Sequence, residues 1–253
     1  YADNSVPSWA VPVYSLGLPF VTFLAWKLGG WRRQVSWYDL WRTCVAFLFA
    51  VFLTAAITNC LKVAIGRPRP NFVFRCWPDG QVVLSDGNEF GGYAVCTTDP
   101  ATEAEHRKSF PSGHSSWSAS GLGFLTFWLL GQTGAFRGAG RSWPLLLSLL
   151  PALAAIVVGV SRITDYWHNV SDVCFGLGLG FFVSLVAYFK VYPFWTNEFC
   201  DVPTYAHERE RPTWRPKRSA LGMQPSEGRE GSAAVAGGQL PQAYASGRGD
   251  YWH

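Results

Sequence analysis

The chain has 253 residues, of which 49% are hydrophobic and 15% charged, against about 25% charged in an average soluble domain. The formal net charge at pH 7 is +4, and the basic residues form no stripe interleaved with aromatic side chains, which argues against a nucleic-acid partner. Composition therefore excludes a disordered or acidic protein. The apolar residues are concentrated in long stretches, and these stretches indicate which class of protein the chain belongs to.

Five stretches of low charge are candidates to cross a membrane as helices, for which about 18 residues or more are needed. In chain order they run over 9–26, 41–61, 116–130, 144–160 and 170–188, and the third is short unless its polar start is counted. Any one of them alone could be a buried helix of a soluble protein. Together they predict an all-α, polytopic transmembrane helix bundle with five spans.

These stretches divide the chain into a transmembrane domain at 1–192 and a tail at 193–253, with a long polar loop at 71–110. Beyond about residue 208 the tail is rich in Gly, Ser, Pro, Arg and Glu without sustained apolar periodicity, so we expect it to be largely disordered. The chain begins at Tyr1 and shows no signal-peptide pattern. We expect a further N-terminal span to precede it.

Basic residues in the polar segments indicate the orientation. One side holds Lys27, Arg32, Arg33, Arg42, Arg137, Arg141, Lys190 and the basic start of the tail. The other holds Lys62, Arg67, Arg69, Arg75, Arg107, Lys108 and Arg162. Because retained positive charge marks the cytoplasmic face, the first side and the tail are predicted to be cytosolic. The second side is predicted to face the lumen or the exterior, although functional basic residues there distort the rule.

The first of three polar clusters on that second side is Lys62-Val-Ala-Ile-Gly-Arg-Pro-Arg-Pro70. The spacing of Lys62 and Arg69 would put them on one face of a continuous helix, while Pro68 and Pro70 indicate that the helix ends here. Two cations therefore converge at a helix end near the membrane boundary. Arg67, in the same cluster, fits equally well as an interfacial side chain that anchors the helix.

The second cluster, Ser109-Phe-Pro-Ser-Gly-His114, opens the next predicted helix. Pro111 suits a first helical turn. Ser112 and Gly113 can aim backbone N–H groups at an anion, and His114 then lies at the positive end of the helix.

The third cluster is Ser161-Arg-Ile-Thr-Asp-Tyr-Trp-His-Asn-Val-Ser-Asp172. His168 and Asp172 are an i, i+4 pair, so on a helix the carboxylate can reach one imidazole nitrogen and leave the other free as a nucleophile. Such a pair on its own is more often a structural hydrogen bond. The other two clusters favour a catalytic role for this pair. Together the three clusters supply fixed positive charge for a phosphate and two histidines that can act on opposite sides of the phosphorus.

The three clusters resemble the signature of the type 2 phosphatidic acid phosphatase family, the integral-membrane lipid phosphate phosphatases. The family pattern Lys-x6-Arg-Pro is met by Lys62, Arg69 and Pro70, Pro-Ser-Gly-His by residues 111–114, and Ser-Arg-x5-His-x3-Asp by Ser161, Arg162, His168 and Asp172. The surrounding residues are similar to the plant and fungal branch that acts on phosphatidate and diacylglycerol pyrophosphate. The resemblance covers about residues 3–192, and the family's usual six helices agree with a span preceding the chain.

This resemblance implies a metal-independent lipid phosphatase that needs no cofactor. His168 would attack phosphorus and form a phosphohistidine, Asp172 would stabilise the imidazole, and His114 would protonate the leaving oxygen. The phosphate-binding residues would be Lys62, Arg69, Ser112, Gly113 and Arg162. Their cations would replace the metal clamp of other phosphoryl-transfer enzymes.

The expected substrate is a membrane lipid phosphate, because a site at the membrane boundary can take a headgroup while the acyl chains stay in the bilayer. Phosphatidate would give diacylglycerol, and diacylglycerol pyrophosphate would give phosphatidate. Polyprenyl pyrophosphates and sphingoid phosphates remain alternatives. A catalytically silent lipid-binding relative is the alternative of a different class, which the intact His114, His168 and Asp172 disfavour.

Of the six cysteines, Cys44, Cys60 and Cys174 fall within apolar stretches and are expected to pack as small hydrophobic residues. Cys200 falls on the predicted reducing side. Cys76 and Cys96 share the long loop on the predicted oxidising side, where a disulfide between them is expected. Two free loop thiols are the alternative.

Overall fold

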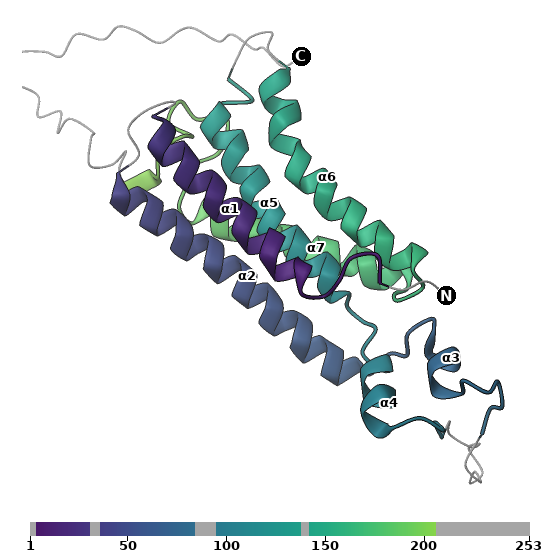
Figure 1. Cartoon of the computed structure of the whole chain (residues 1–253). Helices are drawn as coiled ribbons and strands as arrows, with labels where there is room; N and C mark the ends of the chain where they lie inside the picture. The colour runs from purple at the N-terminus through teal and green to yellow at the C-terminus, as the bar shows by residue number, and fades with distance from the viewer. Residues whose placement is uncertain (1–3, 31–35, 84–94, 138–141, 206–253) are drawn as a thin grey trace, which may run out of the picture. The chain divides into compact units, whose positions relative to one another are not determined.

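The computed structural model describes residues 4–30, 36–83, 95–137 and 142–205 (Figure 1). Every regular element in these ranges is a helix: α1 (Ala10–Gly29), α2 (Trp37–Ile65), α3 (Phe72–Cys76), α4 (Pro100–His106), α5 (Gly113–Thr133), α6 (Trp143–Thr164) and α7 (Val170–Phe189). The predicted all-α, polytopic bundle is confirmed. Each of the five apolar stretches lies within a long helix, apart from Trp9, which caps α1.

Four of these helices, α1, α2, α6 and α7, are long and apolar enough to cross a membrane. The predicted third span, α5, has 21 residues, but its many Ser and Gly residues make it less apolar. α5 is less apolar because it lies among the other long helices: α1, α2, α6 and α7 all pack against it. Close approach requires small residues: a Cβ on Gly121 would lie 2.2 Å from the Ser15 carbonyl oxygen, and one on Gly180 would lie 2.4 Å from that of Ser116.

An aromatic core joins the helices in the half of the bundle that contains the C-terminal half of α5. Phe23 packs edge-on against Phe47 and Trp128, with ring centroids 5.7 and 4.8 Å apart. The Tyr192 and Thr43 hydroxyls lie 2.6 Å apart in the same buried region. Such aromatic contacts add packing energy beyond the area they bury.

Residues 193–205, placed by the sequence in the tail, pack onto this end of the bundle. Trp195 donates its indole N–H to the Phe127 carbonyl oxygen at 3.0 Å, Cys200 is fully buried, and the Thr204 amide donates to the Val191 carbonyl. Residues 206–253, the remainder of the predicted tail, lie outside the described residues.

At the opposite end, four helix termini meet: the end of α2, the start of α5, the end of α6 and the start of α7. The polar loop with α3 and α4 lies at this end (Figure 1). A disulfide joins Cys76 to Cys96 in the loop, with Cα atoms 4.6 Å apart. All three polar clusters therefore lie at one end of the bundle.

Candidate active site

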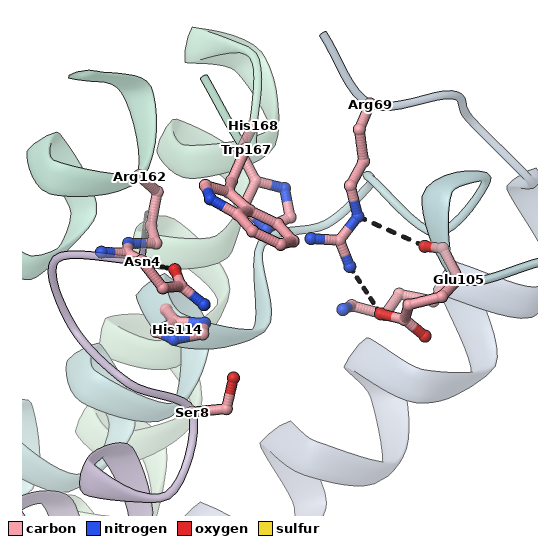
Figure 2. A pocket seen from close by; sticks show the side chains of 9 residues that line it. Asn4, Ser8, Arg69, Glu105, His114, Arg162, Trp167 and His168 are labelled. Atoms are coloured by element: carbon pink, nitrogen blue, oxygen red, sulfur yellow. Dashed lines mark hydrogen bonds and ion pairs between the residues drawn. The ribbon is translucent and has the colours of Figure 1, made fainter. Parts of the chain in front are cut away.

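A cavity of about 280 Å³ opens between these helix termini (Figure 2). It is lined by Asn4, Ser8, Lys62, Arg69, Glu105, His114, Arg162, Trp167 and His168. Five of the residues singled out in the sequence, from all three clusters, therefore face one space. Asp172 lies behind His168, while Ser112 and Gly113 belong to the turn that begins α5 and do not line this cavity.

Arg162, at the end of α6, is completely buried and held on all sides. Its guanidinium donates to the Asp165 carboxylate at 2.8 Å and to the Ser161 hydroxyl at 3.0 Å. It also donates to the side chain of Asn4 and to the Val6 carbonyl. These contacts fix the cation at the cavity wall and satisfy a charge that would otherwise be costly to bury.

Arg69, on the segment after α2, is the second fixed cation. Its guanidinium donates to the Glu105 carboxylate at 2.6 Å and to the Glu105 carbonyl at 3.2 Å. It also stacks over the Trp167 ring at 5.0 Å. Lys62 reaches across from α2 to the start of α5, where a Cβ on Gly113 would lie 3.5 Å from its Nζ.

The start of α5 is organised by hydrogen bonds among its own residues. The Ser112 side chain caps the helix by accepting from the Ser115 amide at 3.4 Å, and it accepts from the Ser115 hydroxyl at 2.9 Å. The Ser112 amide donates to the Asp172 carbonyl at 3.0 Å. In the next turn His114 Nε2 lies 3.2 Å from the Val6 carbonyl oxygen. Because a carbonyl only accepts, this contact places a proton on Nε2.

His168 does not lie on a helix, contrary to the predicted i, i+4 arrangement. It occupies the turn between α6 and α7, because Asn169 is the N-cap of α7 and Asp172, at N3, completes a capping box with it. His168 Nδ1 is 3.8 Å from Asp172 Oδ2, too long for a direct hydrogen bond. The nearer neighbour is the Ser109 hydroxyl, at 3.5 Å.

The environment of His168 favours the neutral imidazole. Burial is the main cause that lowers its pKa from the ordinary value of 6.5, and the nearby cations Arg69 and Lys62 lower it further. Asp172 opposes the shift. A neutral ring keeps a nitrogen lone pair, which is the form that can act as a nucleophile.

Three charged or polar side chains of the site were not assigned to it from the sequence. Glu105, on α4, pairs with Arg69; Ser109 donates to Asp172 at 2.5 Å; and Arg67, which fitted a membrane anchor equally well, donates to Asp172 at 2.7 Å. The last two contacts cross more than 60 positions of the chain. Only the Asn169-x-x-Asp172 capping pattern could have revealed locally that a helix begins after His168.

A second cavity, of about 270 Å³, adjoins the first. It is lined by Ser8, Val11, Pro12, Gly113, His114 and Trp117, and it shares Ser8 and His114 with the cavity described above. Most of its wall is apolar and comes from the starts of α1 and α5. His114 therefore stands between a charged cavity and an apolar one.

Within the described ranges, no group of three or more His, Cys, Asp or Glu side chains is arranged to hold a metal ion. The charged partners at the cavity are instead arginines, a lysine and the carboxylates that pair with them. This donor set suits an anion such as phosphate.

Comparison with known proteins identifies the family. Residues 43–195 match the profile of the PAP2 superfamily. The chain is 44% identical over 193 residues to "Lipid phosphate phosphatase 1" of Arabidopsis thaliana, an alignment that covers 76% of this chain and 57% of that protein. It is 34% identical over 184 residues to "Probable diacylglycerol pyrophosphate phosphatase 1" of Schizosaccharomyces pombe, covering 72% and 66%.

The corresponding "Diacylglycerol pyrophosphate phosphatase 1" of Saccharomyces cerevisiae is 34% identical over 183 residues, covering 72% of this chain and 62% of that protein. The chain spans about three fifths of the length of the plant relatives it matches. No solved structure matches it. The family profile covers more than half of the chain, including all three clusters around the cavity, and the chain therefore belongs to the PAP2 superfamily.

Proposed function

We propose that this chain is a lipid phosphate phosphatase that hydrolyses phosphate monoesters or pyrophosphates of membrane lipids without a metal. The observation that carries the proposal is the single cavity where two histidines face three cations at one end of an apolar helix bundle. The cations supply charge for a phosphate dianion, and the histidines supply a nucleophile and a proton. The names of the plant and fungal relatives support the same activity.

In the proposed reaction, His168 Nε2 attacks phosphorus and forms a P–N bond as the P–O bond to the lipid breaks. His114 enters the step as the imidazolium, gives one proton to the leaving oxygen and is left as the neutral imidazole, so that diacylglycerol leaves as the neutral alcohol. In the second step His114 takes a proton from water, whose oxygen attacks phosphorus and breaks the P–N bond. Asp172 stabilises the positive charge that develops on the His168 ring.

The non-bridging phosphate oxygens would be held by Lys62, Arg69 and Arg162, with Ser112 and Gly113 at the start of α5. Three of these groups are cations at the cavity wall, and the other two lie where an α-helix presents its positive end. Charge-assisted hydrogen bonds to oxygens that gain charge in the transition state lower the barrier without a metal.

The apolar cavity beside His114 supports a lipid rather than a soluble phosphate as the substrate. His114 is the proposed proton donor to the leaving oxygen, so the leaving group must lie on its side. The wall formed by Val11, Pro12 and Trp117 suits the glycerol and first acyl carbons of diacylglycerol. A polyprenyl pyrophosphate or a sphingoid phosphate could use the same wall, so a substrate panel must decide between them.

Phosphate release by the purified chain in detergent micelles tests the function. We expect hydrolysis of phosphatidate and diacylglycerol pyrophosphate, with little turnover of glucose 6-phosphate. His168→Ala, purified identically, is the control for contaminating phosphatases. A chain that binds these lipids but releases no phosphate would instead be the silent lipid-binding relative.

We also propose that the site faces the lumen or the exterior and that the C-terminal tail is cytosolic. Lys27, Arg42 and Lys190 support this orientation, because they lie at the helix ends away from the cavity. Arg32, Arg33, Arg141 and the tail beyond residue 205 lie outside the described residues.

Cysteine labelling of sealed vesicles of known orientation tests this topology. Asp79, in the loop on the cavity side, and Thr196, beyond the far end of α7, are both exposed. In a parent variant with exposed Cys60 and Cys174 replaced by alanine, an impermeant thiol reagent outside right-side-out vesicles should label Asp79→Cys but not Thr196→Cys. The opposite result would place the active site in the cytosol.

A further inference from the structure

The carboxylate of Asp172 is completely buried and already has three partners. Oδ2 accepts from the Ser109 hydroxyl at 2.5 Å and from the Asn169 amide at 3.0 Å. Oδ1 accepts from the Arg67 guanidinium at 2.7 Å. Asp172 therefore cannot act on His168 alone, and its position depends on the groups that surround it.

Ser109 lies beside the carboxylate and the imidazole and contacts both. Its hydroxyl oxygen lies 2.5 Å from Asp172 Oδ2 and 3.5 Å from His168 Nδ1. A hydroxyl has one proton, and a carboxylate that accepts from Arg67 and a backbone amide has none to offer. The Ser109 proton therefore goes to Asp172, and the Ser109 oxygen is left to accept from Nδ1–H of His168.

This assignment determines the tautomer of the nucleophile. With the proton on Nδ1, the lone pair lies on Nε2, the nitrogen proposed to attack phosphorus. The long Nδ1 contact is what a resting site shows before the charge on the ring develops and tightens it. In this arrangement the imidazole is oriented by a hydroxyl relay and only indirectly by the carboxylate.

We propose that Ser109 and Arg67 are positioning residues for catalysis, in which Ser109 relays the His168 Nδ1–H to Asp172 and Arg67 fixes Asp172 in the position that the relay requires. The proposal rests on the proposed function. Neither residue lines the phosphate cavity. Their loss should therefore lower kcat and leave the binding of phosphate-like anions almost unchanged.

The test of the relay is Ser109→Ala in the full chain, with steady-state kinetics on micellar phosphatidate and inhibition by inorganic phosphate. The matched control is Ser148→Ala. Ser148, on α6, is also fully buried and also donates a hydroxyl hydrogen bond, but it lies near the end of α5 that is far from the cavity. A lost hydrogen bond to a charged group predicts that Ser109→Ala lowers kcat by about 10- to 100-fold. KM, the inhibition constant of inorganic phosphate and the melting temperature should stay close to those of the control.

The role of Arg67 in holding Asp172 is tested by Arg67→Gln, which removes the charge, and by Arg67→Lys, which restores it. Arg107→Gln is the control, because Arg107 is as exposed as Arg67 (39% against 38%) and also forms an ion pair, but with Glu103. We expect Arg67→Gln to lower kcat at least about tenfold, Arg67→Lys to recover part of the loss, and Arg107→Gln to have no effect. In an Asp172→Asn chain, Ser109→Ala should lower kcat further by less than about twofold, because the residues act as one unit.

An unchanged kcat in both Ser109→Ala and Arg67→Gln would overturn the proposal. So would losses that appear equally in KM and in inhibition by inorganic phosphate, which would mean that the whole cavity had been disturbed. If Ser109→Ala fails to fold, the comparison of kcat between Arg67→Gln and Arg67→Lys still tests the proposal. A parent chain inactive on every lipid phosphate would refute the proposed function itself, which separates the two failures.

Discussion

The carboxylate of Glu105 pairs with Arg69, one of the proposed phosphate ligands. Glu105 accepts a hydrogen bond from Arg69 at 2.6 Å and lines the cavity together with Lys62. Arg69 and Lys62 are both proposed phosphate ligands. A substrate phosphate that uses Arg69 has to displace this carboxylate or share the guanidinium with it. Replacing Glu105 with the neutral, nearly isosteric Gln should therefore favour anion binding.

The size of the effect follows from the exposure of the pair. Glu105 is 55% exposed while Arg69 is 8% exposed, so solvent screens much of the attraction. Ion pairs of this kind contribute about 0.2–1 kcal/mol. Since about 1.4 kcal/mol corresponds to a factor of ten, Glu105→Gln should strengthen anion binding by about 1.4- to fivefold.

Vanadate inhibition of phosphatidate hydrolysis measures this effect directly, because vanadate mimics the five-coordinate transition state. The control is Glu103→Gln, which removes a carboxylate from the same helix but one that pairs with Arg107 and does not line the cavity. The inhibition constant should fall for Glu105→Gln and stay constant for Glu103→Gln. A weaker inhibition after Glu105→Gln would refute the reasoning, since it would mean that Glu105 is needed to hold Arg69 in place for the anion.

Four further predictions follow from the site and the loop beside it. His168→Ala should abolish turnover and any acid-labile phosphoenzyme, whereas His114→Ala should still form phosphoenzyme from a substrate with a good leaving group, as gel autoradiography can show. EDTA should leave activity intact, and strict dependence on Mg²⁺ would contradict the metal-free site. Because burial lowers the pKa of His168 from its ordinary value of 6.5, protonation of the nucleophile should cause a loss of kcat/KM, corrected for substrate ionisation, only at a pH below 6.5. Peptide mapping without reduction should find Cys76 linked to Cys96, and reducing this closure of about 20 residues should cost about 3 kcal/mol of stability on the chain-entropy model.

Much of the site could be predicted because its residues are close neighbours in sequence at helix ends. α2 ends at Ile65 with Gly66 as its C-cap, shortly before Arg69, and the cap at Ser112 begins another helix next to His114. When helices are long enough to cross a bilayer, such junctions alternate between its two faces. Local signals were therefore enough to bring three clusters to one end of the bundle.

The partners of these residues could not be predicted, because they come from distant parts of the chain. Glu105 lies 36 positions from Arg69, while Ser109 and Arg67 lie 63 and 105 positions from Asp172, and no local pattern indicates these contacts. α5, which contains the predicted third span, is less apolar than α1, α2, α6 and α7, because its buried Ser and Gly residues allow close helix packing. The hydropathy of a helix indicates that it crosses a membrane only when part of its surface faces lipid, whereas a helix surrounded by other helices can be rich in small polar residues.

The three carboxylates at the site differ in a way that decides which of them yields to the substrate. Each pairs with one arginine: Asp172 with Arg67, Asp165 with Arg162, and Glu105 with Arg69. The side chains of Asp172 and Asp165 are 0% and 5% exposed, against 55% for Glu105. A buried carboxylate that loses its cation has no water to replace it and pays several kcal/mol, on the order of the 3–5 kcal/mol measured for broken buried pairs. Glu105 can instead turn into solvent, so we expect an entering phosphate to exchange with Glu105 while the pairs formed by Arg162 and Arg67 stay intact.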